Sequence, residues 1–142
     1  MKGTIQPARI LVIDDNPADI MLLRHALNQF GDPYELRVLK DGEEALDFVQ
    51  RHSTAHEQPC VIVLDLHLPR YDGLAVLRAI KREPALAHIH VVILSALATP
   101  DEEFAMAHAG VRLYQSKPMD LDGLTAVAGQ ILDICREPLA AA

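Results

Sequence analysis

Short runs of apolar residues alternate five times with longer stretches in which apolar positions recur at helical spacing. This alternation predicts a parallel sheet with helices on both faces. We expect the strands at 8–13, 34–39, 60–64, 90–94 and 111–114. The run 60–64 is apolar throughout, which is typical of a central strand that is buried on both faces.

Residues that start helices follow the strands. Asn16-Pro17, Asp41, Thr99-Pro100 and Asp120 each supply a side-chain acceptor at a helix start, in two cases followed by proline at the first helical position. One further helix is expected to run to Arg82, and glycines end two of the five. The fold class is therefore α/β, a (βα)5 flavodoxin-like three-layer sandwich with strand order 2-1-3-4-5.

Composition narrows the class of protein. The 142 residues fit one domain, with a core at 8–136 and short tails at 1–7 and 137–142. The net charge of -7 argues against nucleic acid as a partner, because phosphate-binding surfaces need clustered Lys and Arg. We expect no secretory signal, no membrane span and a cytoplasmic location. Cys60 and Cys135 have no metal-ligand spacing around them, so we expect two buried free thiols.

Chemically useful side chains come at or soon after the ends of the strands. Asp14 and Asp15 follow the first strand, Asp65 the third and Ser95 the fourth, while Lys117 comes three residues after the fifth. Each alone is more often a solvated turn residue than a functional one. Because ligands of such folds bind beyond the carboxyl ends of the strands, we expect the five side chains to converge there.

Three carboxylates gathered at one edge repel each other unless a cation is present. Hard oxygen ligands without thiolate favour Mg²⁺ or Mn²⁺. With Lys117 beside the ion, Asp65 is placed to attack a phosphoryl group and form an aspartyl phosphate, and Ser95 can donate a hydrogen bond to that group.

These motifs resemble the receiver domains of response regulators in two-component signalling. The resemblance rests on Asp14-Asp15, Asp65 with Leu68-Pro69 and Asp72-Gly73, Ser95-Ala96 and Lys117-Pro118, and it covers residues 9–136. It implies that Asp65 accepts a phosphoryl group from a histidine kinase. Asp15, Asp65 and the backbone carbonyl of His67 would hold the metal, Asp14 would act largely through water, and the Lys117-Pro118 bond would be cis.

The resemblance also implies a conformational switch. On phosphorylation, Ser95 would move toward the phosphoryl group and Tyr114 would turn inward, which would remodel the face built from the helix that begins after Thr99, the strand 111–114 and the last helix. His67 and Leu97 occupy positions that tune water access in the family, and the His67 side chain is expected to face solvent. A narrower similarity, to stand-alone receivers that work with phytochrome-type histidine kinases, rests on four segments: Asn16-Pro17-Ala18-Asp19, Leu39-Lys40-Asp41-Gly42, Leu46-Asp47-Phe48 and 65–69.

The last helix has an unusually broad apolar arc, and Asp133 is the one charged residue opposite it. We hypothesise that part of this face meets a second subunit, so that the protein dimerises through the switch face. The alternative is a well-buried helix in a monomer.

Three other functions compete with a phosphoacceptor. A haloacid-dehalogenase-type phosphohydrolase also forms an aspartyl phosphate, but its nucleophile follows the first strand in a D-x-D arrangement, whereas Asp14 and Asp15 are adjacent. A flavin-binding protein of the same architecture would need a loop rich in Ser, Thr and Gly where this chain has acids. A receiver-like adaptor that is never phosphorylated stays open, although such proteins commonly lack one of the acids or the Lys.

Overall fold

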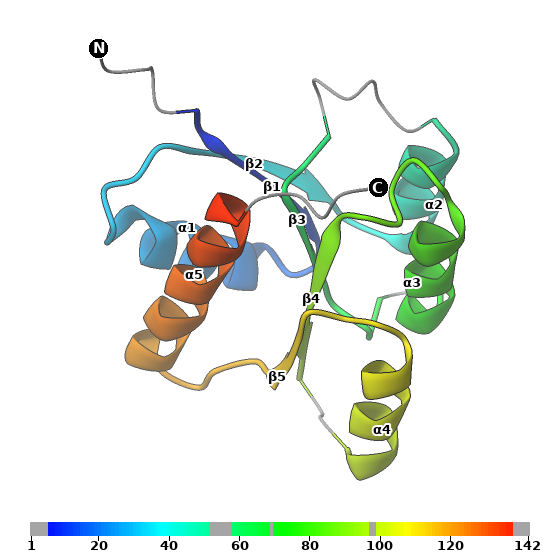
Figure 1. Ribbon diagram of the computed structural model, residues 1–142. Helices are drawn as coiled ribbons and strands as arrows, with labels where there is room; N and C mark the ends of the chain where they lie inside the picture. Colours follow the sequence, from blue (N-terminus) through cyan, green and yellow to red (C-terminus); the bar gives the residue numbers. More distant parts are fainter. Residues whose placement is uncertain (1–5, 52–57, 69, 97–98, 138–142) are drawn as a thin grey trace.

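The computed structural model describes residues 6–51, 58–68, 70–96 and 99–137. Five strands and five helices alternate along the chain (Figure 1). Their bounds are β1 Ala8–Ile13, α1 Pro17–Asn28, β2 Tyr34–Leu39, α2 Gly42–Gln50, β3 Val61–Leu64, α3 Gly73–Arg82, β4 His90–Ser95, α4 Pro100–His108, β5 Leu113–Ser116 and α5 Leu121–Arg136.

All four strand pairings are parallel, and the order across the sheet is β2-β1-β3-β4-β5. The predicted fold class and strand order are confirmed. β3 lies at the centre, and its four residues are buried, as the apolar run indicates. Because all the strands point the same way, the residues that follow β1, β3, β4 and β5 share one edge of the sheet.

Helices cover both faces of the sheet (Figure 1). On one face, α1 and α5 pack against each other and enclose a cluster that includes Leu27 and Ile131. On the other face, residues of α2, α3 and α4 bury a second cluster around Phe48, Leu77 and Met106. The two clusters are the two halves of a three-layer core, separated by alternate side chains of the same strands.

Side-chain caps begin the helices. The carboxylate or hydroxyl oxygens of Asp41, Thr99 and Asp120 each accept a backbone hydrogen bond from the residue three positions later. Asn16 accepts from Ala18 and Asp19. Each cap satisfies an N–H group that has no partner within its helix, which explains why these helices start where the sequence predicts.

The fifth strand lies two residues later than predicted, at Leu113–Ser116 rather than 111–114. Gly110 has a φ of 76° and turns the chain after α4. Arg112 then donates its backbone N–H to Val91, and the ladder with β4 follows. As a result, Tyr114 lies within the strand opposite Ile93, and Lys117 directly follows the strand.

The broad apolar arc of α5 is largely accounted for by burial within the chain. Five of its residues are buried: Val127, Ala128, Ile131, Leu132 and Ile134. A Cβ atom added at Gly129 would lie 2.9 Å from the Phe30 ring, so the glycine allows close packing beside the end of α1. This favours the well-buried helix of the two alternatives, while dimerisation stays a prediction.

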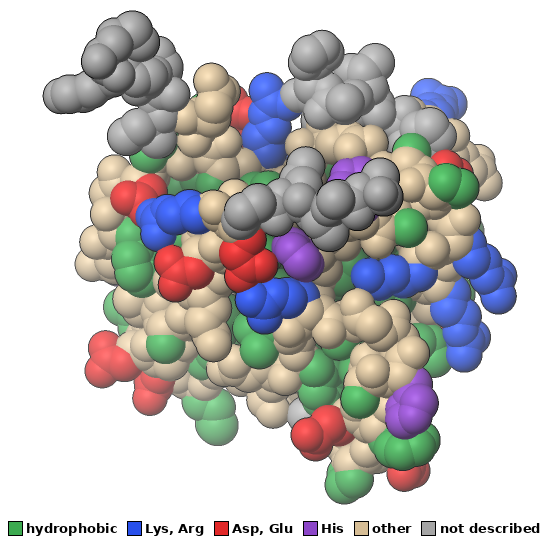
Figure 2. Space-filling model, viewed as in Figure 1, with side chains coloured by type: hydrophobic (Ala, Val, Ile, Leu, Met, Phe, Trp, Pro, Cys, Tyr) green, Lys and Arg blue, Asp and Glu red, His purple; other side chains and the backbone are tan. Residues whose placement is uncertain are grey.

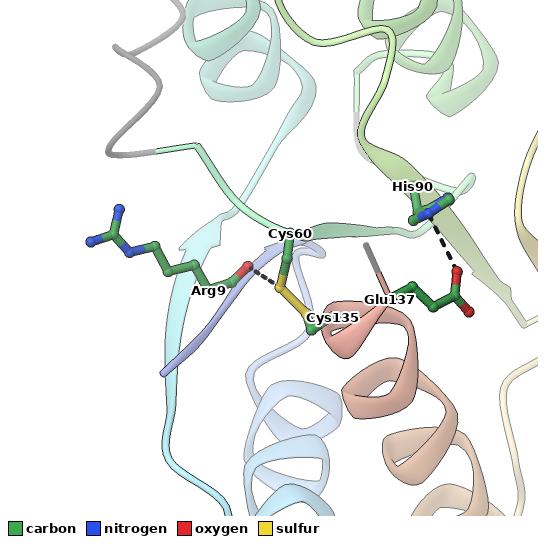
Figure 3. The surroundings of a disulfide bond; sticks show 5 residues. All are labelled: Arg9, Cys60, His90, Cys135 and Glu137. Carbon is green, nitrogen blue, oxygen red and sulfur yellow. Dashed lines mark hydrogen bonds and ion pairs between the residues drawn. A yellow bond between two sulfur atoms is a disulfide. The ribbon is translucent and has the colours of Figure 1, made fainter. Parts of the chain in front are cut away.

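The expectation of two free thiols is wrong. Cys60, just before β3, and Cys135, at the end of α5, form a disulfide across 75 residues of sequence (Figure 3). Their spacing carries no local signal, because the fold itself brings the start of the central strand beside the end of the last helix. Cys60 Sγ also lies 3.2 Å from the Arg9 carbonyl oxygen, which would accept a hydrogen bond from a reduced thiol.

Charges are distributed unevenly on the face shown in Figure 2, with basic side chains more frequent on the side of α2 and α3 and acidic ones on the side of α1 and α5. Among the described helices, none is both long and apolar enough to cross a bilayer.

Candidate functional site

The carboxyl end of the sheet brings the predicted acids together. Ile13 of β1 pairs with Leu64 of β3, so the residues that follow, Asp14 and Asp65, emerge side by side. The Asp65 backbone N–H donates to Ile13, which extends the ladder into the site. One carboxylate oxygen from each of Asp14, Asp15 and Asp65 lies within 4.8 Å of the others.

The three carboxylates differ in exposure. Asp14 and Asp65 are buried, with 7% and 5% of their surface exposed, whereas Asp15 is exposed. Such a set of hard oxygen donors, two of them enclosed and one open to water, fits a small divalent cation that keeps several of its own waters. We therefore regard these three residues as the groups that could hold a metal.

Lys117 extends into the same site from the end of β5. Its ammonium donates hydrogen bonds to Asp14 Oδ2 at 3.1 Å, Asp65 Oδ2 at 3.0 Å and Asp19 Oδ2 at 2.7 Å. Its backbone N–H donates to Ser95, which fixes the start of the loop. These three acceptors match the three protons of the ammonium.

The predicted cis bond between Lys117 and Pro118 is wrong, because the described residues contain no cis peptide bond and this one is trans. Trans is the lower-energy isomer of an X-Pro bond by about 0.5–1 kcal/mol.

Burial and charge shift the pKa values of two of these groups. Burial raises the pKa of Asp14, because desolvation disfavours the carboxylate, and the negative charge of Asp65 adds to the effect. The backbone N–H of Asn16 and the ammonium of Lys117 oppose that rise. Burial by itself lowers the pKa of Lys117, but its hydrogen bonds to Asp19 and Asp65 and the nearby negative charges more than offset this, so that its pKa is raised.

Ser95 ends β4 with its side chain fully buried. Its hydroxyl lies 3.1 Å from Nε2 of His67, and the same nitrogen lies 3.5 Å from Glu102 Oε2. The His67 side chain is 46% exposed, as expected for a residue at the rim, but its inner edge contacts Ser95 rather than facing solvent alone. Its backbone N–H donates to Asp65 Oδ1 at 2.9 Å.

Tyr114 completes a chain of polar contacts. Its hydroxyl donates to Glu102 Oε1 at 2.6 Å. Burial raises its pKa to about 12, helped by the hydrogen bond to Glu102 and by that carboxylate's charge. Ser95, His67, Glu102 and Tyr114 thus link the end of β4, the loop after β3, the first turn of α4 and the middle of β5.

The structure brings together six of the seven predicted site residues directly at the rim, and Tyr114 reaches the rim through Glu102 and His67. Sequence reasoning did not assign roles to Asp19 and Glu102. Both lie in the first turn of a helix, where acids are common for reasons of helix stability, so their position alone carries no site signal. Pro69 and Leu97 lie outside the described residues.

Comparison with known proteins identifies the family to which the sequence is similar. Residues 10–128 match the family model described as the response regulator receiver domain. The response regulator Rcp1 of Synechocystis sp. is 35% identical over 120 residues, which cover 83% of this chain and 82% of Rcp1. The polar-differentiation response regulator DivK of Brucella anthropi is 30% identical over 115 residues, or 81% of this chain and 88% of DivK.

Solved structures agree in fold. The phosphorylated cyanobacterial phytochrome response regulator RcpA superimposes with a TM-score of 0.82 at 31% identity, covering 96% of this chain and 100% of RcpA. The Mn²⁺-bound form of Rcp1 gives a TM-score of 0.80 at 32% identity, covering 95% of this chain and 100% of Rcp1.

Proposed function

The chain belongs to the response regulator receiver domain family, and from this premise we propose that it is the phosphoacceptor of a two-component system, with Asp65 as the residue that takes the phosphoryl group. The observation that carries the proposal is the convergence of Asp65, two further acids and the Lys117 ammonium at one edge of the sheet. We take the receiver domain to be a single unit over residues 1–142, with its core at 8–136.

Asp65 is the carboxylate best placed to act as nucleophile. It is buried at the end of the central strand, Oδ1 is held by the His67 backbone N–H, and Oδ2 faces Lys117. An Asp65 oxygen attacks the phosphorus of a phosphohistidine, the P–N bond breaks, and the imidazole leaves with a proton. The product is an aspartyl phosphate whose added charge lies beside the ammonium of Lys117.

Asp14, Asp15 and Asp65 would hold Mg²⁺ or Mn²⁺, joined by the backbone carbonyl of His67. When bound, the ion supplies positive charge that offsets the charge of the phosphoryl oxygens. The relative Rcp1, whose structure is described as an Mn²⁺-bound form, supports this assignment. The protein's own contribution is to hold the nucleophile and the ammonium in fixed positions before the phosphoryl group arrives.

Ser95 and Tyr114 are the proposed switch residues. On phosphorylation the Ser95 hydroxyl would turn from His67 to the phosphoryl group, and the Tyr114 ring would leave Glu102 and move inward. Glu102 of α4 contacts both Tyr114 and His67, so rearrangement of these two residues would remodel the face formed by α4, β5 and α5. This face is the proposed output surface for protein partners, and a homodimer formed through it would show as a concentration-dependent mass in light scattering.

The donor of the phosphoryl group is proposed to be a histidine kinase, and the similarity to the phytochrome response regulators RcpA and Rcp1 favours one of phytochrome type. A cytoplasmic location follows from such a partner. No observation favours the phosphohydrolase or flavin-binding alternatives. A receiver that is never phosphorylated would not need Asp65, Lys117 and the two other acids in one cluster.

The test is intact-mass measurement after incubation with acetyl phosphate and Mg²⁺. We expect wild type to gain one phosphoryl group, and Asp65→Asn, or wild type in EDTA, to gain none. Asp41→Asn is the matched control, since Asn caps a helix as well as Asp does and this residue lies outside the cluster. Labelling that survives Asp65→Asn, or no labelling of wild type, would reject the proposal.

A further inference from the structure

The ammonium of Lys117 has three carboxylate partners, and they do not have equivalent roles. Asp14 and Asp65 belong to the cluster that could hold a cation, together with Asp15. Asp19 makes the shortest of the three contacts, at 2.7 Å, and reaches the ammonium from the first turn of α1. It therefore contacts the lysine from outside the group of acids that a metal and a phosphoryl group would engage.

The backbone around Asp19 is held in place. Its N–H and that of Ala18 donate to the Asn16 side chain, and Pro17 occupies the first helical position. The N-terminus of a helix favours a negative charge nearby. The Asp19 side chain is 34% exposed and that of Lys117 19%, so the pair is partly shielded from water, unlike a surface ion pair.

Metal binding and phosphorylation alter the other two partners. A bound cation would draw the oxygens of Asp14 and Asp65 toward itself, and phosphorylation would convert the Asp65 carboxylate into an acyl phosphate. A lysine side chain with four rotatable bonds would then be free to move at the step in which its charge is needed. Asp19 is the partner that stays available throughout.

We propose that Asp19 is a positioning residue, which holds the Lys117 ammonium beside Asp65 while the metal and the phosphoryl group engage the other carboxylates. This inference rests on the proposed function. It assigns Asp19 no contact with the metal or with the reacting atoms, so its whole effect passes through Lys117.

The expected effect is on the rate of phosphorylation rather than on metal affinity. With saturating Mg²⁺, Asp19→Ala should lower the rate of phosphorylation by acetyl phosphate about tenfold. A displacement of the Lys117 ammonium by less than about 1 Å is enough for such a loss. Asp19→Asn should fall between Asp19→Ala and wild type, since its carbonyl oxygen still accepts a hydrogen bond but carries no charge. The affinity for Mg²⁺ should change less than about threefold, as expected for a residue outside the metal's ligands.

A double-mutant cycle separates positioning from a structural role. In a Lys117→Ala background, Asp19→Ala should cause no further loss of rate, because the group on which it acts is gone. Asp122→Ala is the matched control, an exposed acid in the first turn of α5, and it should phosphorylate at the wild-type rate. If Asp19→Ala proves too unstable to purify, the same cycle with Asp19→Asn decides the question.

Each outcome separates this inference from the proposed function. If wild type is not phosphorylated, the proposed function fails. If wild type is phosphorylated but Asp19→Ala reacts as fast as Asp122→Ala, the positioning role is overturned and the phosphoacceptor stands. Rate losses that add in the double mutant, or a large fall in Mg²⁺ affinity, would also overturn it.

Discussion

Four carboxylates gather at the carboxyl end of the sheet and three of them contact the Lys117 ammonium, whereas at the amino end arginines are paired with acids and a disulfide joins two elements. Asp14, Asp15, Asp19 and Asp65 gather at the first of these regions. At the second, Arg112 pairs with Glu137, Arg136 with Asp32, and Arg9 with Glu35. The rim thus has four acids to one lysine, whereas at the opposite end each of these three arginines has a carboxylate partner.

The two ends of the sheet therefore differ in what they contribute: the amino end stabilises the fold, and the carboxyl end carries the candidate functional site. Like charges held close together lower the stability of the folded chain until a ligand neutralises them, so the rim is prepared for a cation. Paired charges and a covalent bond at the amino end offset that cost. A hollow of about 630 Å³ also lies at the amino end, around the disulfide, and none of the rim acids lines it.

Breaking the disulfide should have the largest effect on stability. The bond closes a loop across 75 residues, and loss of such a constraint lowers the free energy of unfolding by roughly 2–4 kcal/mol. Thermal unfolding of the oxidised protein with and without dithiothreitol measures this directly. The proposed phosphoacceptor, Asp65, lies at the other end of β3, so phosphorylation by acetyl phosphate should persist below the melting temperature.

The control is Cys60→Ser, whose melting temperature should match that of the reduced wild type and should not change when dithiothreitol is added. Asp65→Asn should keep the full response to dithiothreitol, because it changes only the rim. An unchanged melting temperature on reduction, or two thiols that react with an alkylating reagent in the oxidised native protein, would contradict the crosslink.

The same contrast explains what could be read from the sequence. Strand order, helix caps and the convergence of Asp14, Asp65, Ser95 and Lys117 follow from local patterns combined with one topological rule, because parallel strands bring their carboxyl ends to one edge. The disulfide depends on the distance between two elements far apart in the chain, and no local pattern encodes it. The two-residue shift of β5 arose for a similar reason, since pairing with β4 rather than the apolar run at Val111 decides where that strand starts.

Contacts made by long side chains were the least accessible part of the site. Glu102 joins Tyr114 to His67 only because the first turn of α4 lies within hydrogen-bond reach of both, and Asp19 reaches Lys117 only because α1 starts beside the rim. Both contacts depend on the angle between a helix and the strand before it, and this angle cannot be derived from the residue types alone.

Removing one rim acid should stabilise the metal-free protein. We expect Asp14→Asn to raise the free energy of unfolding in EDTA at neutral pH by an amount on the order of 1 kcal/mol, because burial disfavours the charged form of this carboxylate and Asp65 repels it. The pKa of Asp14 is raised in the folded state, so its contribution to stability is fully present below the unfolded pKa and is lost as the pH rises through the folded value. The gain from Asp14→Asn should therefore grow with pH across the acidic range.

Urea unfolding at several pH values measures the gain, and Asp122→Asn, which removes an exposed acid, controls for net charge. Added Mg²⁺ should stabilise wild type more than Asp14→Asn. A variant less stable than wild type in EDTA at every pH would mean that the attraction between Asp14 and Lys117 outweighs burial and repulsion.

At the amino end, removing a charge should have the opposite sign and the smallest size. Arg112→Gln breaks the contact between its guanidinium and Glu137 Oε2, 2.5 Å away, in a pair whose side chains are 44% and 37% exposed. Water and salt screen such a pair, so we expect a loss of about 0.2–1 kcal/mol in urea unfolding, which shrinks at high ionic strength. Arg24→Gln changes the net charge equally, and no ion pair of Arg24 occurs among the described residues, so it should change stability less. If Arg112→Gln destabilised the protein no more than Arg24→Gln does, its effect would reflect only the change in the net charge of -7, and the contrast between the two ends would be lost.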